Sequence, residues 1–380
     1  MKKILPEVVV LCAILMVVRY GFAQTWTQTS ATVSVYQSIT ESADGRMIMA
    51  VSSSSTVRST NWGVTWNVID SGFSYDVRSS ADGSKLIRVA AGGWIIVSTN
   101  SGVTWAATSL SNRFWVTCAS SADGTKLAAA YTGISDGLIY TSTNSGATWL
   151  ANTAPSNSWG SLASSADGTK LAAIAQNAKI YTSTNSGLTW VPTSAPSNNW
   201  GGIASSADGN RLVVGSVIGI FISTNSGGSW TSNSVIARGS AACSSDGSKL
   251  VVCNTNGQIY ISTNYGISWI SNNIVGNRWS CVASSADGNR LFAAEYGGSS
   301  KVWTYQVTPS PKLNVAPANT NVALSWLVPS TNFVLEQSSD LTTADWVTLT
   351  NTPVLNLTNL NNEVTLSPSN SGGFFRLMTQ

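Results

Sequence analysis

Short runs of alternating apolar and polar residues flank an Asp-Gly pair that recurs seven times along the chain. Each copy has an apolar or small residue five positions before the aspartate and an aliphatic residue four positions after it. Two half-buried strands joined by a tight turn explain this pattern, because Asp-Gly supplies the positive φ that a hairpin needs. Successive copies lie 38 to 44 residues apart, a period typical of a repeat array. The turn aspartates are Asp44, Asp82, Asp123, Asp167, Asp208, Asp246 and Asp287.

A second pattern, Ser-Thr-Asn-x-Gly-x-Thr/Ser-Trp, follows the Asp-Gly pair in six of the copies. Serine and asparagine side chains bind nearby backbone amides, and glycine lets the chain reverse. Tryptophan supplies the large apolar surface that fixes such a turn to the edge of a sheet. We therefore predict structural roles for the asparagine and tryptophan of each copy. They are Asn61, Asn100, Asn144, Asn185, Asn225 and Asn264, and Trp66, Trp105, Trp149, Trp190, Trp230 and Trp269.

These six segments resemble Asp-boxes, the SxDxGxTW motif of sialidase-type and related BNR-repeat β-propellers, with asparagine where the family usually has aspartate. Asparagine keeps the acceptor oxygen and tolerates the left-handed conformation, so we expect the turn to survive the change. The resemblance implies a propeller of four-stranded blades. It also implies that the boxes are structural and lie away from the active site of that family.

Seven Asp-Gly turns stand against six complete boxes, so one blade lacks a Trp-bearing strand. The missing strand is found at the other end of the repeat region, because Trp26 precedes Trp66 by 40 residues, one period. We predict that the strand near Trp26 completes the sheet begun by residues 280 to 307 and removes the exposed edges of a linear array. The expected fold is all-β, with a seven-bladed propeller over residues 24 to 307.

The repeat ends near Thr308, where Pro309 and Pro311 indicate a linker over residues 308 to 312. Residues 313 to 380 contain further alternating runs, which predict a small antiparallel β-sandwich. This region resembles, weakly, the fibronectin-like C-terminal modules of bacterial secreted proteins, on the stretches LEQSSDL and FFRL. The resemblance fits a role in surface retention or export.

The first 23 residues resemble a secretory signal peptide. Lys2 and Lys3 precede an apolar run over residues 8 to 18, and Gly21 and Ala23 occupy the small-residue positions before a cut ahead of Gln24. Eleven apolar residues are fewer than the roughly 20 that span a bilayer. We expect a secreted, periplasmic or cell-surface protein with no membrane insertion after cleavage; a retained anchor is the alternative.

Charge and composition narrow the function classes. Only 10% of the residues are charged, and cleavage of the first 23 leaves 17 basic against 16 acidic residues, so binding of nucleic acid is not expected. The chain has no histidine, which excludes Ser-His-Asp catalysis and histidine-ligated metals. The cysteines show no metal-ligand spacing, and we predict neither a metal nor a cofactor. Cys243 and Cys253 flank one Asp-Gly turn and are candidates for a disulfide, whereas Cys118 and Cys281 fit buried thiols.

An aromatic residue recurs eight positions before the Asp-Gly turn, on the presumed ligand face of the propeller. Indole rings with nearby guanidinium groups could stack sugar rings or grip a peptide. The alternative is that repeated tryptophans wedge between blades as packing. The candidate ligand-binding residues are Tyr36, Trp115, Trp159, Trp200 and Trp279, with Arg113, Arg238 and Arg278.

Catalysis is the weaker hypothesis. Neither the first-strand arginine motif nor the Tyr-Glu pair of sialidases can be matched here. A glycoside hydrolase needs two carboxylates about 5 to 9.5 Å apart. Asp76 and Asp136, near Arg113, are the candidates from adjacent repeats, and solvated loop carboxylates explain the same residues.

In layout the chain is most similar to Asp-box propellers without known catalysis, including the photosystem II assembly and stability factor type, a family that binds protein. We therefore expect a non-catalytic, monomeric protein that binds a protein, peptide or glycan at the ligand face. The alternatives are hydrolysis of an extracellular polysaccharide and a purely structural or adhesive role.

Overall fold

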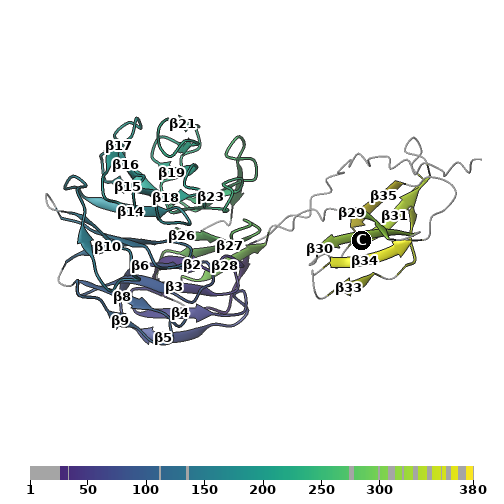
Figure 1. The fold of residues 1–380 in the computed structure, drawn as a ribbon, viewed down its shortest axis with the longest axis horizontal. Coiled ribbons are helices and arrows are strands. Elements are labelled where there is room, and N and C mark those ends of the chain that lie inside the picture. The colour runs from purple at the N-terminus through teal and green to yellow at the C-terminus, as the bar shows by residue number, and fades with distance from the viewer. Residues whose placement is uncertain are drawn as a thin grey trace, which may run out of the picture. The chain divides into compact units, whose positions relative to one another are not determined.

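The computed structural model describes residues 26–32, 34–110, 113–133, 137–273, 278–297 and 300–306, and the segments 313–318, 321–327, 333–339, 345–351, 353–356, 361–366 and 374–379. All regular elements among them are β-strands (Figure 1). The chain divides into the compact unit Gln24–Val307 and a C-terminal unit. The predicted signal peptide lies outside the described residues, as does the predicted linker.

Seven four-stranded antiparallel sheets, the blades, build the first unit. Blade 1 contains β2 (Tyr36–Glu41), β3 (Ile48–Ser52), β4 (Ser55–Ser59) and β5 (Asn67–Ser71), and blade 2 contains β6 (Ser74–Ser79), β7 (Leu86–Ala90), β8 (Trp94–Ser98) and β9 (Ala106–Ala107). Blade 3 contains β10 (Trp115–Ser120), β11 (Leu127–Tyr131), β12 (Ile139–Ser142) and β13 (Leu150–Ala151), and blade 4 contains β14 (Trp159–Ser164), β15 (Leu171–Ala175), β16 (Ile180–Ser183) and β17 (Val191–Pro192).

The later blades follow the same order. Blade 5 contains β18 (Trp200–Ser205), β19 (Leu212–Ser216), β20 (Ile220–Ser223) and β21 (Thr231–Ser232), and blade 6 contains β22 (Ala241–Cys243), β23 (Leu250–Cys253), β24 (Gln258–Ser262) and β25 (Ile270–Asn273). Blade 7 combines β26 (Trp279–Ser284), β27 (Arg290–Glu295) and β28 (Val302–Gln306) with β1 (Thr27–Gln28). The first strand of each blade, β1 excepted, is the innermost, and each innermost strand packs beside that of the next blade, with β26 beside β2.

Blade 7 closes the ring as predicted. Strand β1 pairs antiparallel with β28, placing Thr27 opposite Thr304 and Gln28 opposite Trp303. The buried Trp26 lies 6.1 Å from Trp279 and 5.2 Å from Tyr305 between ring centroids. The two ends of the repeat region are therefore joined by backbone hydrogen bonds and by aromatic packing, and the predicted all-β seven-bladed propeller is confirmed.

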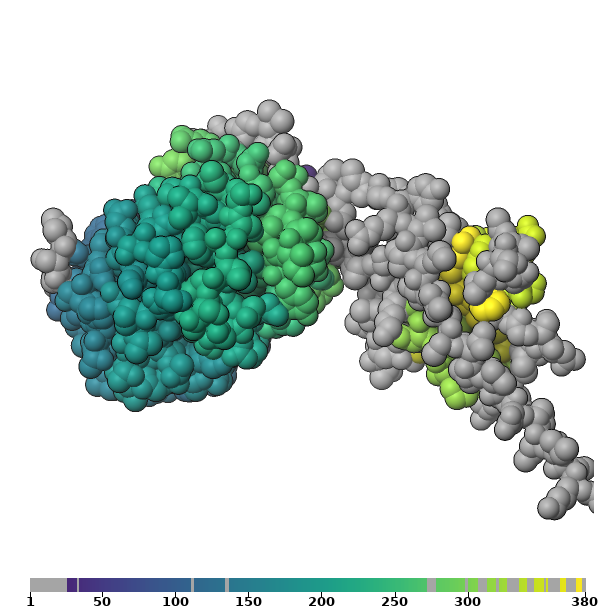
Figure 2. All heavy atoms as spheres, turned by 90° about the horizontal axis from the view of Figure 1, so that it is seen from above, coloured from purple at the N-terminus to yellow at the C-terminus, as the bar shows by residue number. Residues whose placement is uncertain are grey.

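Strand direction defines two faces. The Asp-Gly turns and the Ser-Thr-Asn turns connect strands one to two and three to four, so they lie at one end of every blade, here called the lower face. The remaining connections form the upper face. Figure 2 shows the side chains of successive blades packed against one another over the propeller surface.

A closed circle of backbone hydrogen bonds runs around the lower face. The residue before each turn aspartate donates its N–H to the carbonyl of the corresponding residue in the next blade, at 2.7 to 2.8 Å. The last bond, from Ala286 to Ala43, returns from blade 7 to blade 1. A linear array would leave the donor and the acceptor at its two ends unpaired, so the circle depends on closure. Its members are Ala43, Ala81, Ala122, Ala166, Ala207, Ser245 and Ala286.

Each Asp-Gly turn is held by its own side chains. In blade 2 the Ser80 hydroxyl donates to Asp82 at 2.6 Å and accepts the Lys85 N–H at 2.9 Å. The glycines have φ near +65° to +75°, and the Gly124 Cα packs so closely that an added Cβ would lie 2.7 Å from the Lys85 Cβ of the preceding blade. The turns thus interlock neighbouring blades.

The Ser-Thr-Asn turns share one geometry, seen at Trp66, except that the Trp230 indole N–H has no hydrogen-bond partner among the described residues. The Ser59 hydroxyl accepts the Gly63 N–H at 2.9 Å, and the Asn61 Oδ1 accepts the Thr65 N–H at 2.9 Å. The Trp66 indole N–H donates to the Gly63 carbonyl at 3.0 Å. Trp62, before the glycine, has φ 57°, the left-handed conformation that this tight reversal requires.

The C-terminal unit contains two antiparallel sheets. One has the order β29 (Asn314–Ala318), β30 (Asn321–Leu327), β34 (Asn361–Leu366) and β33 (Val354–Asn356), and the other has the order β32 (Val347–Thr348), β31 (Phe333–Ser338) and β35 (Phe374–Thr379). Leu324, Trp326, Leu335 and Val364 form its buried core, which draws side chains from both sheets. The predicted alternation is thus realised as one buried face on each sheet.

Candidate functional site

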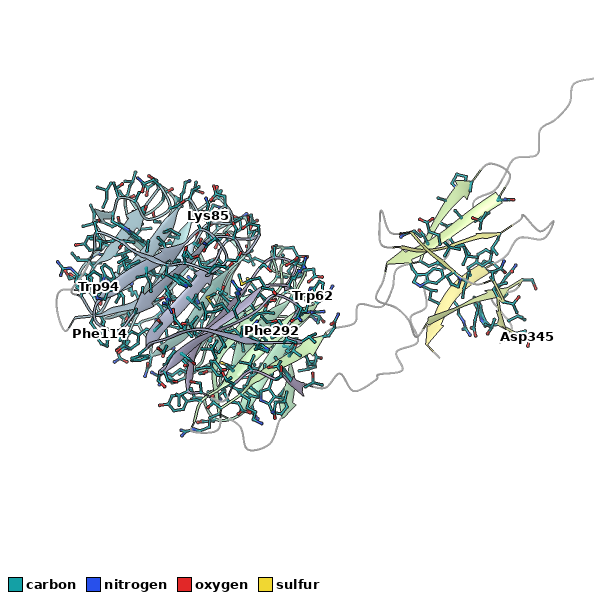
Figure 3. The ribbon with its side chains drawn as sticks, turned by 90° about the horizontal axis from the view of Figure 1, so that it is seen from below. Trp62, Lys85, Trp94, Phe114, Phe292 and Asp345 are labelled. Carbon is teal, nitrogen blue, oxygen red and sulfur yellow. The ribbon has the colours of Figure 1, made fainter. Side chains whose placement is uncertain are left out.

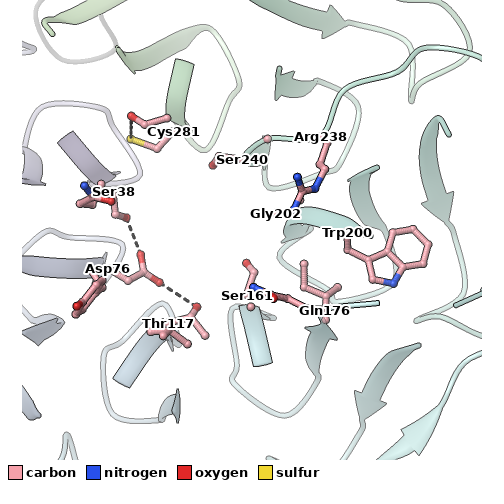
Figure 4. Close-up of a pocket in the computed structure, with 18 of the residues that line it drawn as sticks. Ser38, Asp76, Thr117, Ser161, Gln176, Trp200, Gly202, Arg238, Ser240 and Cys281 are labelled. Carbon is pink, nitrogen blue, oxygen red and sulfur yellow. Dashed lines mark hydrogen bonds between the residues drawn. The ribbon is translucent and has the colours of Figure 1, made fainter. Parts of the chain in front are cut away.

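A cavity of about 360 Å³ opens at the upper end of the central channel (Figure 4). Every blade contributes to its wall, from the first half of its innermost strand or from the residues just before that strand. No other feature of the described structure brings all seven blades together around an open space at the upper face. One lining residue from each blade is Ser38, Asp76, Thr117, Ser161, Gly202, Ser240 and Cys281.

Asp76 is the hub of one side of the cavity. It points inward from β6, and its Oδ1 accepts the Ser38 hydroxyl of blade 1 at 2.6 Å. Its Oδ2 accepts the Thr117 hydroxyl and the Cys118 N–H of blade 3, both at 3.0 Å. Arg78 of its own strand forms a salt bridge with it at 2.6 Å. The carboxylate therefore ties three blades together and is fully engaged in doing so.

The opposite side of the cavity is built from glycines and Arg238. Gly202 donates its N–H to the Gly239 carbonyl at 2.6 Å, and a Cβ on Gly201 would lie 2.5 Å from that oxygen. Glycine is required here because the two backbones touch. Arg238, exposed at the edge, faces Asp76 from across the cavity (Figure 4).

The predicted rim of exposed aromatic residues is wrong. Tyr36 and the four tryptophans eight positions before the turns are at most 4% exposed, so packing, the alternative considered from the sequence, describes them. Trp159 packs edge-on against Tyr181 at 5.4 Å between centroids, and its indole N–H donates to the Gly137 carbonyl at 3.0 Å. Burial raises the pKa of Tyr36 to about 12 even though its hydroxyl donates to the Thr32 carbonyl.

The other three indoles are buried in the same way. Trp115 lies 5.6 Å from Tyr140 between centroids, and Trp200 lies 5.1 Å from Phe221, both edge-on. Trp279 lies 6.3 Å from Trp303. A bulge in the innermost strand of most blades, between Trp115 and Thr117 in blade 3, accompanies the inter-blade position of the aromatic ring.

The three candidate arginines are all exposed on the upper face, but they do not form one cluster around the cavity. Arg238 alone lines it. Arg113 stacks over the Tyr131 ring at 4.6 Å and donates to its hydroxyl at 3.1 Å. Arg278 contributes its carbonyl to a backbone bond from Tyr296, at 2.6 Å.

An aromatic cluster that the sequence analysis missed borders the cavity. Phe73 and Tyr75 lie 4.4 Å apart between centroids, and Tyr75 and Phe114 lie 5.0 Å apart. Tyr75 lines the cavity, whereas Phe114 is 55% exposed and projects from the propeller (Figure 3). We call these three residues the aromatic shelf. Phe73 and Phe114 both stand nine positions before a turn aspartate, where the other five blades have no aromatic residue, so this departure from the repeat is the sequence signal for the cluster.

The alternative catalytic pair is not supported. Asp76 is buried in β6, and five side-chain or backbone groups donate hydrogen bonds to its carboxylate, which differs from the solvated loop carboxylate expected from the sequence. Asp136 lies outside the described residues. Among the described residues no three His, Cys, Asp or Glu side chains gather as metal ligands.

A second cavity of about 280 Å³ occupies the lower half of the channel. The last residue of each innermost strand lines it, and five of these are serines whose hydroxyls donate to the next carbonyl, as Ser79 does at 2.8 Å. Glu41 and Cys243 are the departures from this ring. Both Glu41 carboxylate oxygens are buried without a hydrogen-bond partner, and burial raises the pKa of this group well above its ordinary value.

The predicted disulfide is wrong. Cys243 lies opposite Leu250 in the β22–β23 ladder, whereas the Cys253 N–H bonds the Ser240 carbonyl at 3.0 Å. The two cysteines are therefore three residue pairs apart along the hairpin, and both are free. Burial raises the pKa of Cys243, Cys253 and Cys281 to about 12, which makes these thiols unreactive near neutral pH.

Fold and site together define the class: a seven-bladed β-propeller with an open polar cavity at one mouth of its channel. No family model matches the chain. No curated protein matches it either. No helix in the described part of the chain is long and apolar enough to cross a membrane.

Solved structures share the fold. YCF48 from Cyanidioschyzon merolae is similar with a TM-score of 0.57 and 16% identity, covering 74% of this chain and 98% of that chain. A structure of YCF48 bound to D1 peptide is similar with a TM-score of 0.58 and 16% identity, covering 75% of this chain and 97% of that chain. At this identity the likeness establishes the propeller fold.

Proposed function

We propose that this protein is a non-catalytic propeller that binds a protein, through a peptide segment, at the upper mouth of the channel. The observation that carries the proposal is the 360 Å³ cavity, an open space at the upper face to which all seven blades contribute. A similar propeller has been solved as YCF48 bound to D1 peptide, which supports a peptide as the kind of ligand such a ring accommodates.

The chemistry of the wall favours binding over turnover. The oxygens of the Asp76 carboxylate are occupied by donors from Ser38, Thr117 and Arg78, which fits a structural role. The described residues around the cavity include no second carboxylate. Hydroxyls, glycine backbone and a guanidinium group instead offer hydrogen bonds to an extended polar chain.

A plug in the cavity tests the proposal. Gly160 lines the cavity, and a Cβ placed there meets nothing closer than 3.9 Å, so Gly160→Trp should fill the space without disturbing the ring. Gly72 also has open space but does not line the cavity, which makes Gly72→Trp the matched control. Peptides selected from a random phage-displayed library should bind the wild type and Gly72→Trp but not Gly160→Trp. Failure to select any peptide, or equal binding to both variants, would refute the proposal.

We further propose that the six Ser-Thr-Asn turns are Asp-boxes carrying asparagine, that the C-terminal unit is a fibronectin-like module, and that the protein is exported. The shared turn geometry around Trp66 supports the first, and the two-sheet arrangement supports the second. The sequence of residues 1 to 23 supports export. Cell fractionation with N-terminal sequencing tests it, because export with cleavage yields a chain beginning at Gln24.

A further inference from the structure

The upper face carries cations that its described carboxylates do not neutralise. Asp76 is paired with Arg78, and Asp70 is paired with Arg88. Glu295 accepts the Trp303 indole N–H at 2.6 Å and the Lys301 N–H at 3.2 Å. Among the described residues, no other carboxylate lies in an upper connection or at an upper strand end. Each of the three carboxylates therefore already has a partner within the protein.

Arg238, Arg278 and Lys179, by contrast, are exposed on that face, and none takes part in a salt bridge within the described residues. Arg238 is the one of the three that lines the cavity. With Asp76 and Arg78 cancelling, its guanidinium is the uncompensated charge of the described wall. A ligand carboxylate would meet a planar donor that suits bidentate recognition.

The second feature is apolar. The aromatic shelf continues from the cavity wall at Tyr75 to the exposed Phe114, and its rings pack at tilted and edge-on angles of 52° and 60°. Tyr75 packs against both Phe73 and Phe114, and of the three rings only Phe114 is exposed, so the open surface of the shelf is concentrated at one ring and suits one side chain. A sugar would need a broad exposed ring face, and the indoles at the repeated position, eight residues before the turns, are buried.

We propose that the ligand of the upper cavity is an acidic peptide segment that presents a carboxylate to Arg238 and one aromatic or aliphatic side chain to the aromatic shelf. This inference rests on the proposed function, peptide binding at the upper mouth, and adds the chemical class of the peptide. Asp76 is on the opposite side of the cavity from Arg238, and Tyr75 precedes Asp76 in β6 (Figure 4). The peptide therefore crosses the mouth, with its two anchors on opposite sides.

The composition of selected peptides tests this directly. Random phage-displayed peptides enriched on the wild-type protein should contain Asp or Glu together with an aromatic or aliphatic residue. Their synthetic forms should bind about tenfold more weakly to Arg238→Gln, because the variant loses a charged donor to the peptide carboxylate; tenfold corresponds to about 1.4 kcal/mol. Phe114→Ser should also weaken binding, and raised salt should lessen the effect of Arg238.

Two exposed residues of the lower face provide matched controls. Arg46→Gln removes an exposed guanidinium, and Val103→Ser removes an apolar side chain that is 63% exposed, so both should leave peptide affinity unchanged. Selected peptides without acidic residues would overturn the inference while leaving the proposed function intact. Acidic peptides that bind Arg238→Gln and Phe114→Ser as well as the wild type would also overturn it. Enrichment on a glycan array in place of peptides would defeat both proposals.

Discussion

The two faces of the propeller are built on opposite plans. The lower face repeats one set of contacts seven times: the circle of backbone bonds, the Ser-Asp pair and the glycine that packs on the preceding blade. The upper face repeats little beyond the buried aromatic residue that begins the innermost strand in five of the seven blades. Asp76 and Arg238 have no identical counterpart at the same repeat position of another blade, and Phe114 has one, Phe73 of blade 2.

Loop length follows the same division. The β11–β12 connection on the upper face spans residues 132 to 138, whereas the β19–β20 connection spans only 217 to 219. The lower turns keep one length, so the variation in repeat length falls on the upper face. The contacts that interlock each blade with the next in the same way thus lie on the repeated face, which leaves the other face free to differ from blade to blade.

Asp76→Ala should lower the free energy of unfolding more than any other variant proposed here. A large loss would show that one unrepeated residue of the upper face also holds blades together. Removing this carboxylate leaves Arg78 without its partner and orphans the Ser38 and Thr117 hydroxyls. Breaking a buried pair costs about 3 to 5 kcal/mol. Urea unfolding of the wild type and variant measures the difference, and a loss below that of the glycine variant described next would contradict the assignment of Asp76 as a three-blade hub.

Alanine substitution of one glycine on each face compares how tightly the two faces are packed. Gly288, on the lower face, has φ +65°, and an added Cβ would lie 2.8 Å from the Lys249 Cβ, so Gly288→Ala should cost about 2 to 3 kcal/mol. Gly160→Ala, on the upper face, meets open space and should change the free energy of unfolding by less than about 1 kcal/mol. Thermal melts of the two variants provide the test, and equal effects would mean that the turns do not interlock the blades.

The Glu41 carboxylate, buried in the lower half of the channel, should lower the stability of the fold when it is ionised. Burial raises its pKa in the folded state, so the folded protein loses stability as pH rises from the ordinary glutamate pKa through the raised value. Glu41→Gln should therefore be more stable than the wild type at pH 8, by about 1 to 2 kcal/mol, and the gain should vanish near pH 4. Denaturant titrations at several pH values would show this; a gain independent of pH would contradict it.

The turn aspartates should show the opposite pH dependence with a smaller effect. The Ser121 hydroxyl and the Thr125 N–H and hydroxyl lower the pKa of Asp123 to about 2. This stabilisation is present above the ordinary aspartate pKa and is lost as pH falls toward 2. Asp123→Asn should cost roughly 1 kcal/mol or less at pH 7, because the turn is exposed, and nothing well below pH 2. If Asp123→Asn were still less stable than the wild type well below pH 2, the loss would come from packing and not from the charge of the carboxylate.

The repeat itself was readable because its turns are local. Asp-Gly and Ser-Thr-Asn segments carry their own hydrogen-bond partners within a few residues, as Ser80 and Asp82 do, so their geometry depends little on the rest of the chain. The 40-residue step from Trp26 to Trp66 then predicted ring closure, which the pairing of β1 with β28 confirms. The circle of backbone bonds on the lower face follows from ring closure, but no residue pattern in the sequence predicts it.

The candidate site depended on facts that only the folded ring contains. A bulge between Trp115 and Thr117 changes which side chains face the channel, and a period of two cannot predict such a shift. The indoles consequently lie between blades, and the carboxylate of Asp76 meets partners from positions 38 and 117, far away in sequence. The sequence by itself determined the blades, their number and their closure, because those rest on local turns and a period. Tertiary packing alone decided what lines the cavity, since contacts across the channel join blades that share no local signal.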